Sequence, residues 1–412
     1  MVESDTIVLL ILSFSALLII ISAIHRYARH FIIPGVTIMM FLGAISALLP
    51  AAVGTDFEDI YDILEERLSD LILLVIIPIL IFESGRKLRL GEIKKEALPI
   101  GFFAIIGVII TIFIIGLGIN ISFDIPFIHA LLFGTILAAT DPVAVGAIFK
   151  KFPIPHRLNL ILEGESLFND ATGVISFNVV SAIVFSGVIF SLAETFVSFL
   201  WSMLGAIGLG IVIGWLGGII LNKWNADEHV DFTFSIALAI GGYVVGEHFL
   251  HVSGVVTTLF TAMLLLVKHK EIIRDTRTLF NKYWDYTGFI TNSFLFFLIG
   301  IPLLNLEPSL FSTYGLLIFI APFIIMMASR AIVVCGGSKL LSLFRVTIPL
   351  KWRNILTLGG LRGGISVALV LSIPFGYEFK ELFVAMIIPL IAINLILNPV
   401  LLNRYLSKSK SI

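Results

Sequence analysis

The sequence predicts an all-α integral membrane protein that crosses the bilayer about 13 times. The chain has 412 residues, of which 58% are hydrophobic and only 13% are charged. Soluble domains carry about 25% charged residues, so most of this surface is expected to face lipid. Apolar stretches of the ~20 residues that a transmembrane helix needs recur from one end of the chain to the other. The loops between them are short, so no extramembrane catalytic domain is expected.

Apolar stretches of suitable length give the candidate spans, with boundaries that hydropathy defines only to within a few residues. Their ranges are 6–24, 32–50, 69–85, 98–120, 127–149, 158–187, 192–221, 231–249, 252–268, 286–304, 309–334, 354–374 and 381–405. The region 231–268 can also be divided differently. These ranges predict thirteen transmembrane helices.

The lysine and arginine residues provide an independent test, because they accumulate in cytoplasmic loops. If the N-terminus is outside, 23 of the 27 lysine and arginine residues fall in segments that would be cytoplasmic. Two, Arg67 and Lys380, fall in outer loops, and Arg330 and Arg362 fall inside spans. We therefore expect a multi-pass protein of the cell (inner or cytoplasmic) membrane, with the N-terminus outside and the C-terminus in the cytoplasm.

Ionisable residues inside a membrane span are costly and usually functional. Neither histidine nor lysine falls in the middle of a span, so carboxylates would have to carry any proton across. Asp141 lies about 14 residues into the fifth span and Asp170 about 12 residues into the sixth, which runs the opposite way. Both are therefore expected near mid-bilayer. The carboxylates inside spans are Glu83, Asp141, Glu163, Glu165, Asp170 and Glu247.

The other intramembrane charges are expected nearer the surfaces. Glu83 and Glu165 fall towards the cytoplasmic ends of the third and sixth spans. Arg330 falls at a depth similar to that of Glu165, and pairing would reduce the desolvation cost of both. Glu247 is interpreted as an interfacial residue at the outer mouth, although a part in a transport site is the alternative.

Two spans contain signals for interrupted helices. In the fifth, Thr140-Asp141-Pro142 places a proline in mid-span, and proline removes an amide proton and disfavours helix in the preceding residue. Unwinding there would free backbone carbonyls as cation ligands beside a carboxylate. In the twelfth, four glycines surround an arginine in Gly359-Gly360-Leu361-Arg362-Gly363-Gly364. Both spans are expected to be broken near their centres.

The fifth and twelfth spans cross the membrane in opposite senses. Interrupted helices at corresponding positions of two inverted halves indicate the ion site of a secondary transporter. We find no sequence identity between the halves, so the repeat is inferred from the order of the spans. Arg362 could offset the negative ends of half-helices, play a purely structural part, or contact the ion.

The sixth span carries polar groups on two faces. At 100° per residue, Glu163, Ser166 and Asp170 share one face, while Glu165 and Asn169 share another. Two polar faces cannot both face lipid, so this helix is expected among other helices. A structural role, in which these groups only bond neighbouring helices, is the alternative to ion binding.

These residues resemble motifs of the monovalent cation:proton antiporter-1 family, which includes NhaP-type antiporters and the eukaryotic sodium/proton exchangers. The resemblance implies the NhaA-like antiporter fold, with inverted repeats and crossed discontinuous helices. The matching segments follow one another over most of the chain and are Phe82-Glu83-Ser84-Gly85, Ala139-Thr140-Asp141-Pro142, Glu165-Ser166-Leu167-Phe168-Asn169-Asp170, Phe296-Phe297-Leu298-Ile299-Gly300, Ser329-Arg330 and Gly360-Leu361-Arg362-Gly363-Gly364.

The resemblance also implies residue roles. Asp141 and Asp170 would bind Na⁺, joined by the Ser166 hydroxyl and the Thr140 backbone carbonyl. Glu83 would contribute through water. Glu165 and Arg330 would form a stabilising ion pair, and Asn169 would hold the crossed region by hydrogen bonds. The residues at the helix breaks and their crossing would be Pro142, Gly360, Arg362, Gly363 and Gly364.

The resemblance further implies a homodimer and a division of the chain. Residues 1–97 would form scaffold and dimerisation helices, and 98–190 would form core transport helices. Residues 191–304 would supply a linking helix and further scaffold helices, and 305–412 would supply the remaining core helices with a short cytoplasmic C-terminus. The expected partners are therefore Na⁺ and H⁺ as substrates, membrane lipid and a second copy of the chain, with no nucleic acid and no cofactor.

The expected function is exchange of Na⁺ for H⁺, with Li⁺ as a further candidate, in pH homeostasis. A buried aspartate pair resists double ionisation, so a cation and a proton can each relieve the repulsion and exclude the other. Relatives with aspartate at the position of Asn169 are typically electrogenic, so asparagine resembles the electroneutral one-for-one class. The sequence does not distinguish Na⁺ from Li⁺ or K⁺, nor give the pH set point or the direction of transport.

Three other function classes have recognisable requirements. A sodium-coupled symporter for an organic solute would need a roomy cavity and would take up a labelled metabolite. A channel would need a carbonyl filter or a ring of charges and would conduct. An intramembrane enzyme is disfavoured because the spans lack a His-Glu-x-x-His zinc motif, which the order Glu247-His248-x-x-His251 does not reproduce. We therefore do not expect an enzyme.

Overall fold

A computed structural model of the chain describes residues 2–27, 35–47, 67–141, 148–149, 152, 154–186, 192–224, 227–268, 274–303, 315–374 and 376–408. These residues form helices joined by turns, with no strand among them. Within this part of the chain, 8 helices are long and apolar enough to cross a membrane, and 4 shorter apolar helices accompany them. The structure thus confirms the predicted all-α membrane fold.

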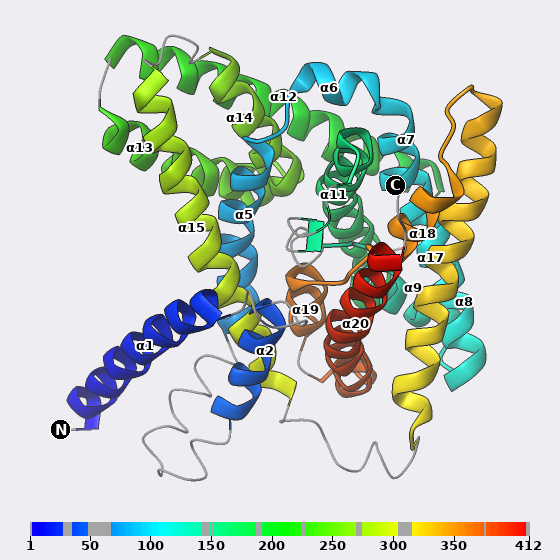
Figure 1. Cartoon of the computed structure of the whole chain (residues 1–412). Helices are drawn as coiled ribbons and strands as arrows, with labels where there is room; N and C mark the ends of the chain where they lie inside the picture. Colours follow the sequence, from blue (N-terminus) through cyan, green and yellow to red (C-terminus); the bar gives the residue numbers. More distant parts are fainter. Residues whose placement is uncertain are drawn as a thin grey trace.

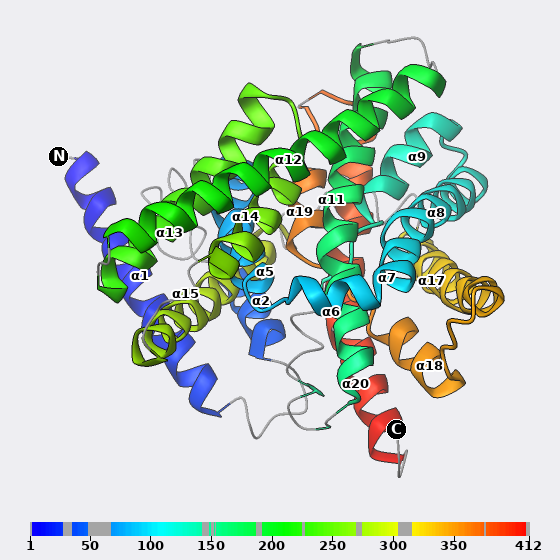
Figure 2. The ribbon, with the colours of Figure 1, turned by 90° about the horizontal axis from the view of Figure 1, so that it is seen from above.

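The helices gather into two groups that lie side by side (Figures 1 and 2). The first group occupies the left of Figure 1. Its members are α1 (Val2–Tyr27), α2 (Gly35–Ser46), the π-helical turn η2 (Ile72–Ile76) with α5 (Ile77–Gly85), α12 (Leu192–Trp224), α13 (Glu228–Val244) with the π-helical turn η4 (Val245–Phe249), α14 (Gly254–Lys268), and α15 (Arg274–Gly300) with the 3₁₀ turn η5 (Ile301–Leu303).

The second group occupies the right and centre of Figure 1 and holds the two broken helices. In Figure 2, α11 and α19 lie between the outer helices of this group and the first group. Its members are α6 (Leu90–Lys95), α7 (Ala97–Gly101), the π-helical segment η3 (Phe102–Gly107), α8 (Val108–Phe123), α9 (Phe127–Ile136), α11 (His156–Ser186), α17 (Leu317–Leu343), α18 (Leu350–Leu358), α19 (Gly364–Leu371) and α20 (Lys380–Lys408).

Each predicted span coincides with one of these helices or with two half-helices and the break between them, where the structure describes it. Two helices are longer than their apolar stretches. α15 begins at Arg274, well before the predicted start at 286, and α17 continues to Leu343, beyond the predicted end at 334. Hydropathy marks the apolar part of a helix, whereas backbone hydrogen bonds continue into the polar part beyond the bilayer.

Glycines bring the backbones of α2 and α15 together. A Cβ atom at Gly43 would overlap the carbonyl oxygen of Phe297, and one at Gly300 would overlap that of Met40. Only hydrogen fits at these two positions, one on each helix, so the helices touch without an intervening layer of side chains. The first group therefore contains one very closely packed helix pair.

One buried hydrogen bond joins the two groups. Pro399 of α20 has no amide proton, so the carbonyl of Leu395, four residues earlier, lacks its helical partner. The hydroxyl of Thr37 on α2 donates to this carbonyl at 3.1 Å, and Thr37 is fully buried. The proline thus creates an acceptor inside an apolar interface, and a threonine of the other group satisfies it.

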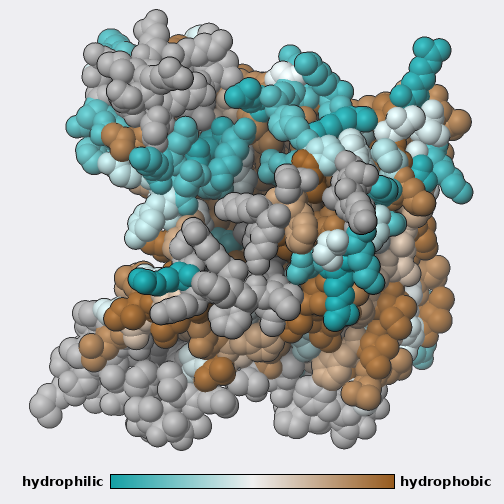
Figure 3. Space-filling view, viewed as in Figure 1, coloured by the Kyte–Doolittle hydropathy of each residue, from teal (hydrophilic) through white to brown (hydrophobic). Residues whose placement is uncertain are grey.

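The outer surface has the distribution expected of a protein in a bilayer. Hydrophilic residues gather along the upper edge of Figure 3, over α6, while hydrophobic residues cover the side formed by α17. Well-exposed large apolar side chains on the outer helices include Phe113 and Leu117 of α8 and Ile324 of α17. Such faces are suited to lipid contact rather than to water.

Candidate ion-binding site at the crossing of two interrupted helices

The first interruption follows α9. This helix ends at Ile136, five residues before Asp141, and residues 139–141 have no regular structure. The sequence predicted unwinding around Thr140-Asp141-Pro142, so the helix ends earlier than the proline requires. The hydroxyl of Ser366 donates to the carbonyl of Ile136 at 2.7 Å and satisfies one group at this helix end. Pro142 itself lies outside the described residues.

The second interruption separates α18 from α19. α18 ends at Leu358, residues 360–363 are non-helical, and α19 begins at Gly364. The glycine-rich stretch from Gly360 to Gly364 therefore breaks the helix as predicted. Both half-helices before a break present backbone carbonyls without helical partners, and these carry partial negative charge.

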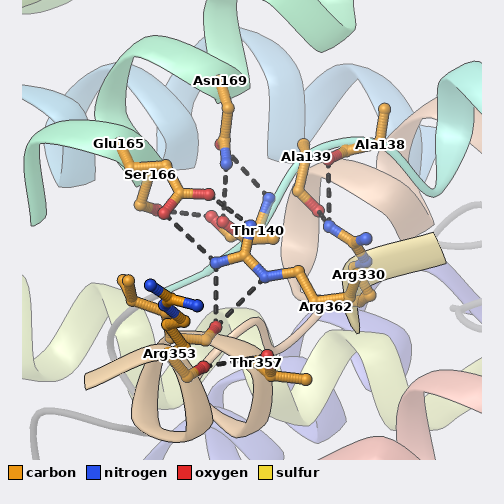
Figure 4. Close-up of polar contacts among 11 residues, drawn as sticks. Ala138, Ala139, Thr140, Glu165, Ser166, Asn169, Arg330, Arg353, Thr357 and Arg362 are labelled. Carbon is orange, nitrogen blue, oxygen red and sulfur yellow. Dashed lines mark hydrogen bonds and ion pairs between the residues drawn. The ribbon is translucent and has the colours of Figure 1, made fainter. Parts of the chain in front are cut away.

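The two interruptions cross and bond to each other. The backbone amide of Asp141 donates to the carbonyl of Leu361 at 2.8 Å. In return, the guanidinium of Arg362 donates to the carbonyls of Ala138 and Ala139 at 2.9 and 2.7 Å (Figure 4). Arg362 is 1% exposed and offsets the negative end of α9, which is one of the roles that the sequence left open. The crossing is thus fixed by hydrogen bonds in both directions.

A cavity of about 60 Å³ lies at this crossing. Its polar lining includes Asp141, Ser166, Asp170 and the nearby Thr140, and its apolar lining includes Leu80 of α5. Asp141 and Asp170 are both partly buried residues. A cavity of this size has room for a few water molecules or a small ion. The structure thus brings together the two aspartates that the sequence placed at one depth.

Two side chains of α11, those of Asn169 and Ser166, hold the non-helical residue Thr140 against this helix. Asn169 accepts the Thr140 amide proton at 3.2 Å and donates its own side-chain amide to the Thr140 hydroxyl at 2.6 Å. The hydroxyl of Ser166 donates to the Thr140 carbonyl (Figure 4). Asn169 thus occupies the bracing position that the resemblance implied. Ser166 and the Thr140 carbonyl, both expected to bind the cation, bond to each other here.

Glu165 and Arg330 form a buried ion pair beside the second interruption. Their side chains are 2% and 7% exposed, and both carboxylate oxygens of Glu165 accept from the guanidinium of Arg330. Arg330 also donates to the carbonyl of Leu356 at 2.9 Å, near the end of α18. An arginine therefore meets the negative end of each half-helix, Arg362 at α9 and Arg330 at α18.

Glu83 is not part of the cavity lining, although its neighbour Ser84 is. Its carboxylate forms an ion pair with Lys87 and lies 3.6 Å from a guanidinium nitrogen of Arg86. Arg86 also bonds to Asp285 of α15 at 2.5 Å, so charged side chains form a network of ion pairs at this end of α5. The structure therefore places Glu83 beside the site rather than within it.

The two remaining intramembrane glutamates have local partners. Glu163 accepts a hydrogen bond from Asn159 at 2.8 Å, one turn earlier on α11. Glu247 accepts from the backbone amide of Gly254 at 2.8 Å, at the first residue of α14, and from Asn178 at 3.2 Å. Neither lines the cavity, and Glu247 satisfies a helix N-terminus. These contacts fit the interfacial interpretation of Glu247.

Two residues of the crossing were not singled out from the sequence. Asn394 of α20 is fully buried and accepts the backbone amide proton of Arg362 at 3.0 Å. Ser366 of α19 lines the cavity as well as satisfying the end of α9. The available signal was a lone asparagine in the apolar run Ile391-Ala392-Ile393-Asn394-Leu395, because buried amides require partners.

Comparisons with known proteins identify the family of this chain. The family described as sodium/hydrogen exchanger, transmembrane, matches residues 14–408. The chain belongs to this family. The resemblance to cation:proton antiporters that the motifs predicted is therefore confirmed.

Two relatives cover most of the chain. The Na⁺/H⁺ antiporter ApNhaP of Aphanothece halophytica is 32% identical over 90% of this chain and 68% of its own length. The Na⁺/H⁺ antiporter NhaP of Pseudomonas aeruginosa is 31% identical over 80% of this chain and 78% of its own length. Among solved structures, the sodium proton antiporter MjNhaP1 from Methanocaldococcus jannaschii at pH 8 aligns with a TM-score of 0.76, 19% identity and 99% of both chains covered. This likeness shows that the fold is shared.

Proposed function

We propose that this protein exchanges Na⁺ for H⁺ across the cell membrane at the cavity where the two interruptions cross. One observation carries the proposal: Asp141 of the first interruption and Asp170 of α11 line the same small cavity inside a membrane protein. The relatives of this family, which are named Na⁺/H⁺ antiporters, support the choice of ions. A secondary transporter of this kind needs no cofactor.

The proposed mechanism is competition for the aspartate pair. Two carboxylates facing one small cavity repel each other when both are ionised. A cation bound by Asp141 and Asp170, or a proton on one of them, relieves this repulsion, so the two substrates exclude each other. The Ser166 hydroxyl and the Thr140 carbonyl complete the oxygen ligands, since each oxygen keeps a lone pair that their mutual hydrogen bond does not use. Glu83 contributes through water if its ion pair with Lys87 is released.

Alternating access would come from movement of one helix group against the other. The group that holds α9, α11, α18, α19 and α20 carries the ion, and the first group serves as the scaffold and forms the homodimer. The broken helices, the aspartates and the Glu165–Arg330 pair all lie in the second group. This division supports rigid movement of the site as a unit. The lysine and arginine distribution supports an orientation with the N-terminus outside and the C-terminus in the cytoplasm.

The proposed stoichiometry is one Na⁺ for one H⁺. At the crossing, Asn169 occupies a position where a carboxyl group could take up an additional proton, but an amide cannot titrate. Exchange of one monovalent cation for one proton moves no net charge. The rival symporter reading finds no support in the names of the relatives, and a cavity of about 60 Å³ is small for an organic solute.

The test uses purified protein in liposomes that contain a pH-sensitive dye. Asp170→Asn keeps the shape of the side chain but cannot bind a proton, so Na⁺-driven proton movement is expected to disappear. Glu163→Gln is the matched control on the same helix, because Glu163 bonds only to Asn159 among the contacts described above, and full activity is expected. Retained exchange in Asp170→Asn would contradict the proposal.

The stoichiometry is tested in the same liposomes with a potassium and valinomycin clamp. Electroneutral exchange is insensitive to the imposed voltage, whereas electrogenic exchange accelerates or slows with it. Equal initial rates at opposite clamp voltages are expected. Replacing Na⁺ by Li⁺ or K⁺ at constant voltage gives the cation preference.

A further inference from the structure

Two asparagines make the same contact in the two halves of the second helix group. Asn169 on α11 accepts the backbone amide proton of Thr140, in the first interruption, at 3.2 Å. Asn394 on α20 accepts that of Arg362, in the second interruption, at 3.0 Å. Each asparagine lies on the helix that follows the broken one, and each is at most 1% exposed. The inverted halves, which share no recognisable sequence identity, therefore share this hydrogen bond.

The contact of Asn394 leads directly to the ion site. The amide that it holds belongs to Arg362, and the adjacent carbonyl of Leu361 accepts the backbone amide proton of Asp141 at 2.8 Å. On the other side of Arg362, Gly363 packs so closely against Asp141 that a Cβ atom would overlap the carboxylate. Movement of the backbone at Arg362 would therefore displace Asp141.

The hydrogen bonds of Asn394 indicate that its side-chain oxygen is the group that acts on the second interruption. Its amide nitrogen is buried and makes no hydrogen bond within the described residues. A buried donor without a partner lowers stability, and an apolar residue would avoid that cost in the surrounding apolar run. The acceptor contact with Arg362 is the compensating gain that the structure provides.

We propose that Asn394 is a positioning residue for the cation site and the counterpart of Asn169 in the second half. It holds the backbone of the second interruption so that the Leu361 carbonyl keeps Asp141 in place at the cavity. The inference rests on the proposed function, since it assigns Asn394 an effect on Na⁺ exchange. It requires that loss of the acceptor weakens cation binding more than it weakens the fold.

The experiment compares four variants with the unmodified protein in the same liposomes. Asn394→Ala and Asn394→Leu both remove the acceptor, the first with a smaller side chain and the second with a larger one. Asn394→Asp keeps an acceptor oxygen while replacing the unpartnered amide. Asn398→Ala is the control, because Asn398 lies one turn further on α20 and is equally buried, and its side chain has a single 3.5 Å contact, with the sulfur of Met327, among the described residues. The KM for Na⁺, the maximal rate and the thermal unfolding midpoint are measured for each.

The KM for Na⁺ is expected to rise about tenfold in Asn394→Leu and Asn394→Ala, because a buried amide loses its partner beside the site. Asn394→Asp should bring the KM back towards the wild-type value, and Asn398→Ala should leave it unchanged. An unchanged KM in Asn394→Leu would overturn the inference. So would losses of rate in Asn394 and Asn398 variants that follow thermal stability alone, or failure of both acceptor-free variants to fold while Asn394→Asp folds. Absence of exchange in the unmodified protein would instead reject the proposed function.

Discussion

The two interruptions of the helix bundle contribute opposite charges to one crossing. The first carries Thr140 and Asp141, which both line the cavity. The second carries Arg362 among glycines, and its guanidinium bonds to the carbonyls at the end of α9. Both half-helices meet an arginine at their negative ends, yet only the first supplies a carboxylate.

This difference separates two tasks that an ion site must combine. In the proposed mechanism the first interruption binds the cation, because Thr140 and Asp141 line the cavity. The second stabilises, because it supplies positive charge to unpaired carbonyls and leaves room for the Asp141 carboxylate next to Gly363. If the separation is correct, substitutions around the second interruption should change stability or the affinity for Na⁺ without removing the ability to bind a proton.

The largest effect on stability is expected where the charge balance at α18 is broken. Glu165→Ala leaves the guanidinium of Arg330 buried without its carboxylate, since the side chains are 2% and 7% exposed. Removing one partner of a buried ion pair costs about 3–5 kcal/mol. The free energy of unfolding should fall by that amount, measured as a lower midpoint in thermal or denaturant unfolding of purified protein in detergent.

The double variant Glu165→Ala with Arg330→Met serves as the control for this effect. It removes the stranded charge, so it should be more stable than Glu165→Ala alone, although the Leu356 carbonyl loses a partner. A double variant that is no more stable than the single one would show that the pair does not act through charge.

An intermediate effect is expected from adding a methyl group at the second interruption. Gly363→Ala would place a Cβ atom against the carboxylate of Asp141, where the close approach of the backbone allows only hydrogen. The KM for Na⁺ should rise by about tenfold or more, equivalent to about 1.4 kcal/mol or more of lost binding. The measurement is Na⁺-dependent proton movement in liposomes over a range of Na⁺ concentrations.

Gly336→Ala is the matched control, because the added methyl group on α17 would meet no described atom within 4 Å beyond its chain neighbours and the backbone of its own helix. This variant should bind Na⁺ as the unmodified protein does. Equal KM values for the two glycine variants would mean that Gly363 is not needed to accommodate Asp141.

The smallest effect is expected at the end of α9. Ser366→Ala removes the hydrogen bond to the Ile136 carbonyl at 2.7 Å, and such a bond contributes about 1 kcal/mol. Stability should fall by about that amount, and exchange should persist at a rate within a few fold of the unmodified protein. In Ser372→Ala the lost hydroxyl bonds only within its own segment, to Leu369, so a smaller change is expected. A loss of all exchange in Ser366→Ala would assign the hydroxyl to ion binding instead.

The sequence was sufficient for the fold because a membrane imposes strong rules on composition. Apolar stretches located the helices, and the motif Thr140-Asp141-Pro142 and the glycines around Arg362 located the two interruptions. The depth argument brought Asp141 and Asp170 to one cavity, since antiparallel helices of known rise leave little freedom. The same reasoning placed Glu165 beside Arg330.

The remaining features depend on side-chain packing, which periodicity does not report. Glu83 belongs to a conspicuous motif, but its neighbours Lys87 and Arg86 hold its carboxylate outside the cavity lining. Asn394 belongs to no motif that we recognised, yet it bonds to the second interruption. Hydropathy also does not predict helix ends that lie in polar segments, such as the start of α15, because the helix continues beyond the bilayer.

The contact of α2 and α15 at Gly43 and Gly300 has a mechanical consequence. Helices normally slide over one another by small adjustments of the side chains between them, and this pair has none at its closest point. The two helices should therefore move together as one rigid body. Spin labels attached to α2 or α15 would provide a fixed reference, and distances from them to labels on α11 or α20 would report displacement of the ion-carrying helices alone.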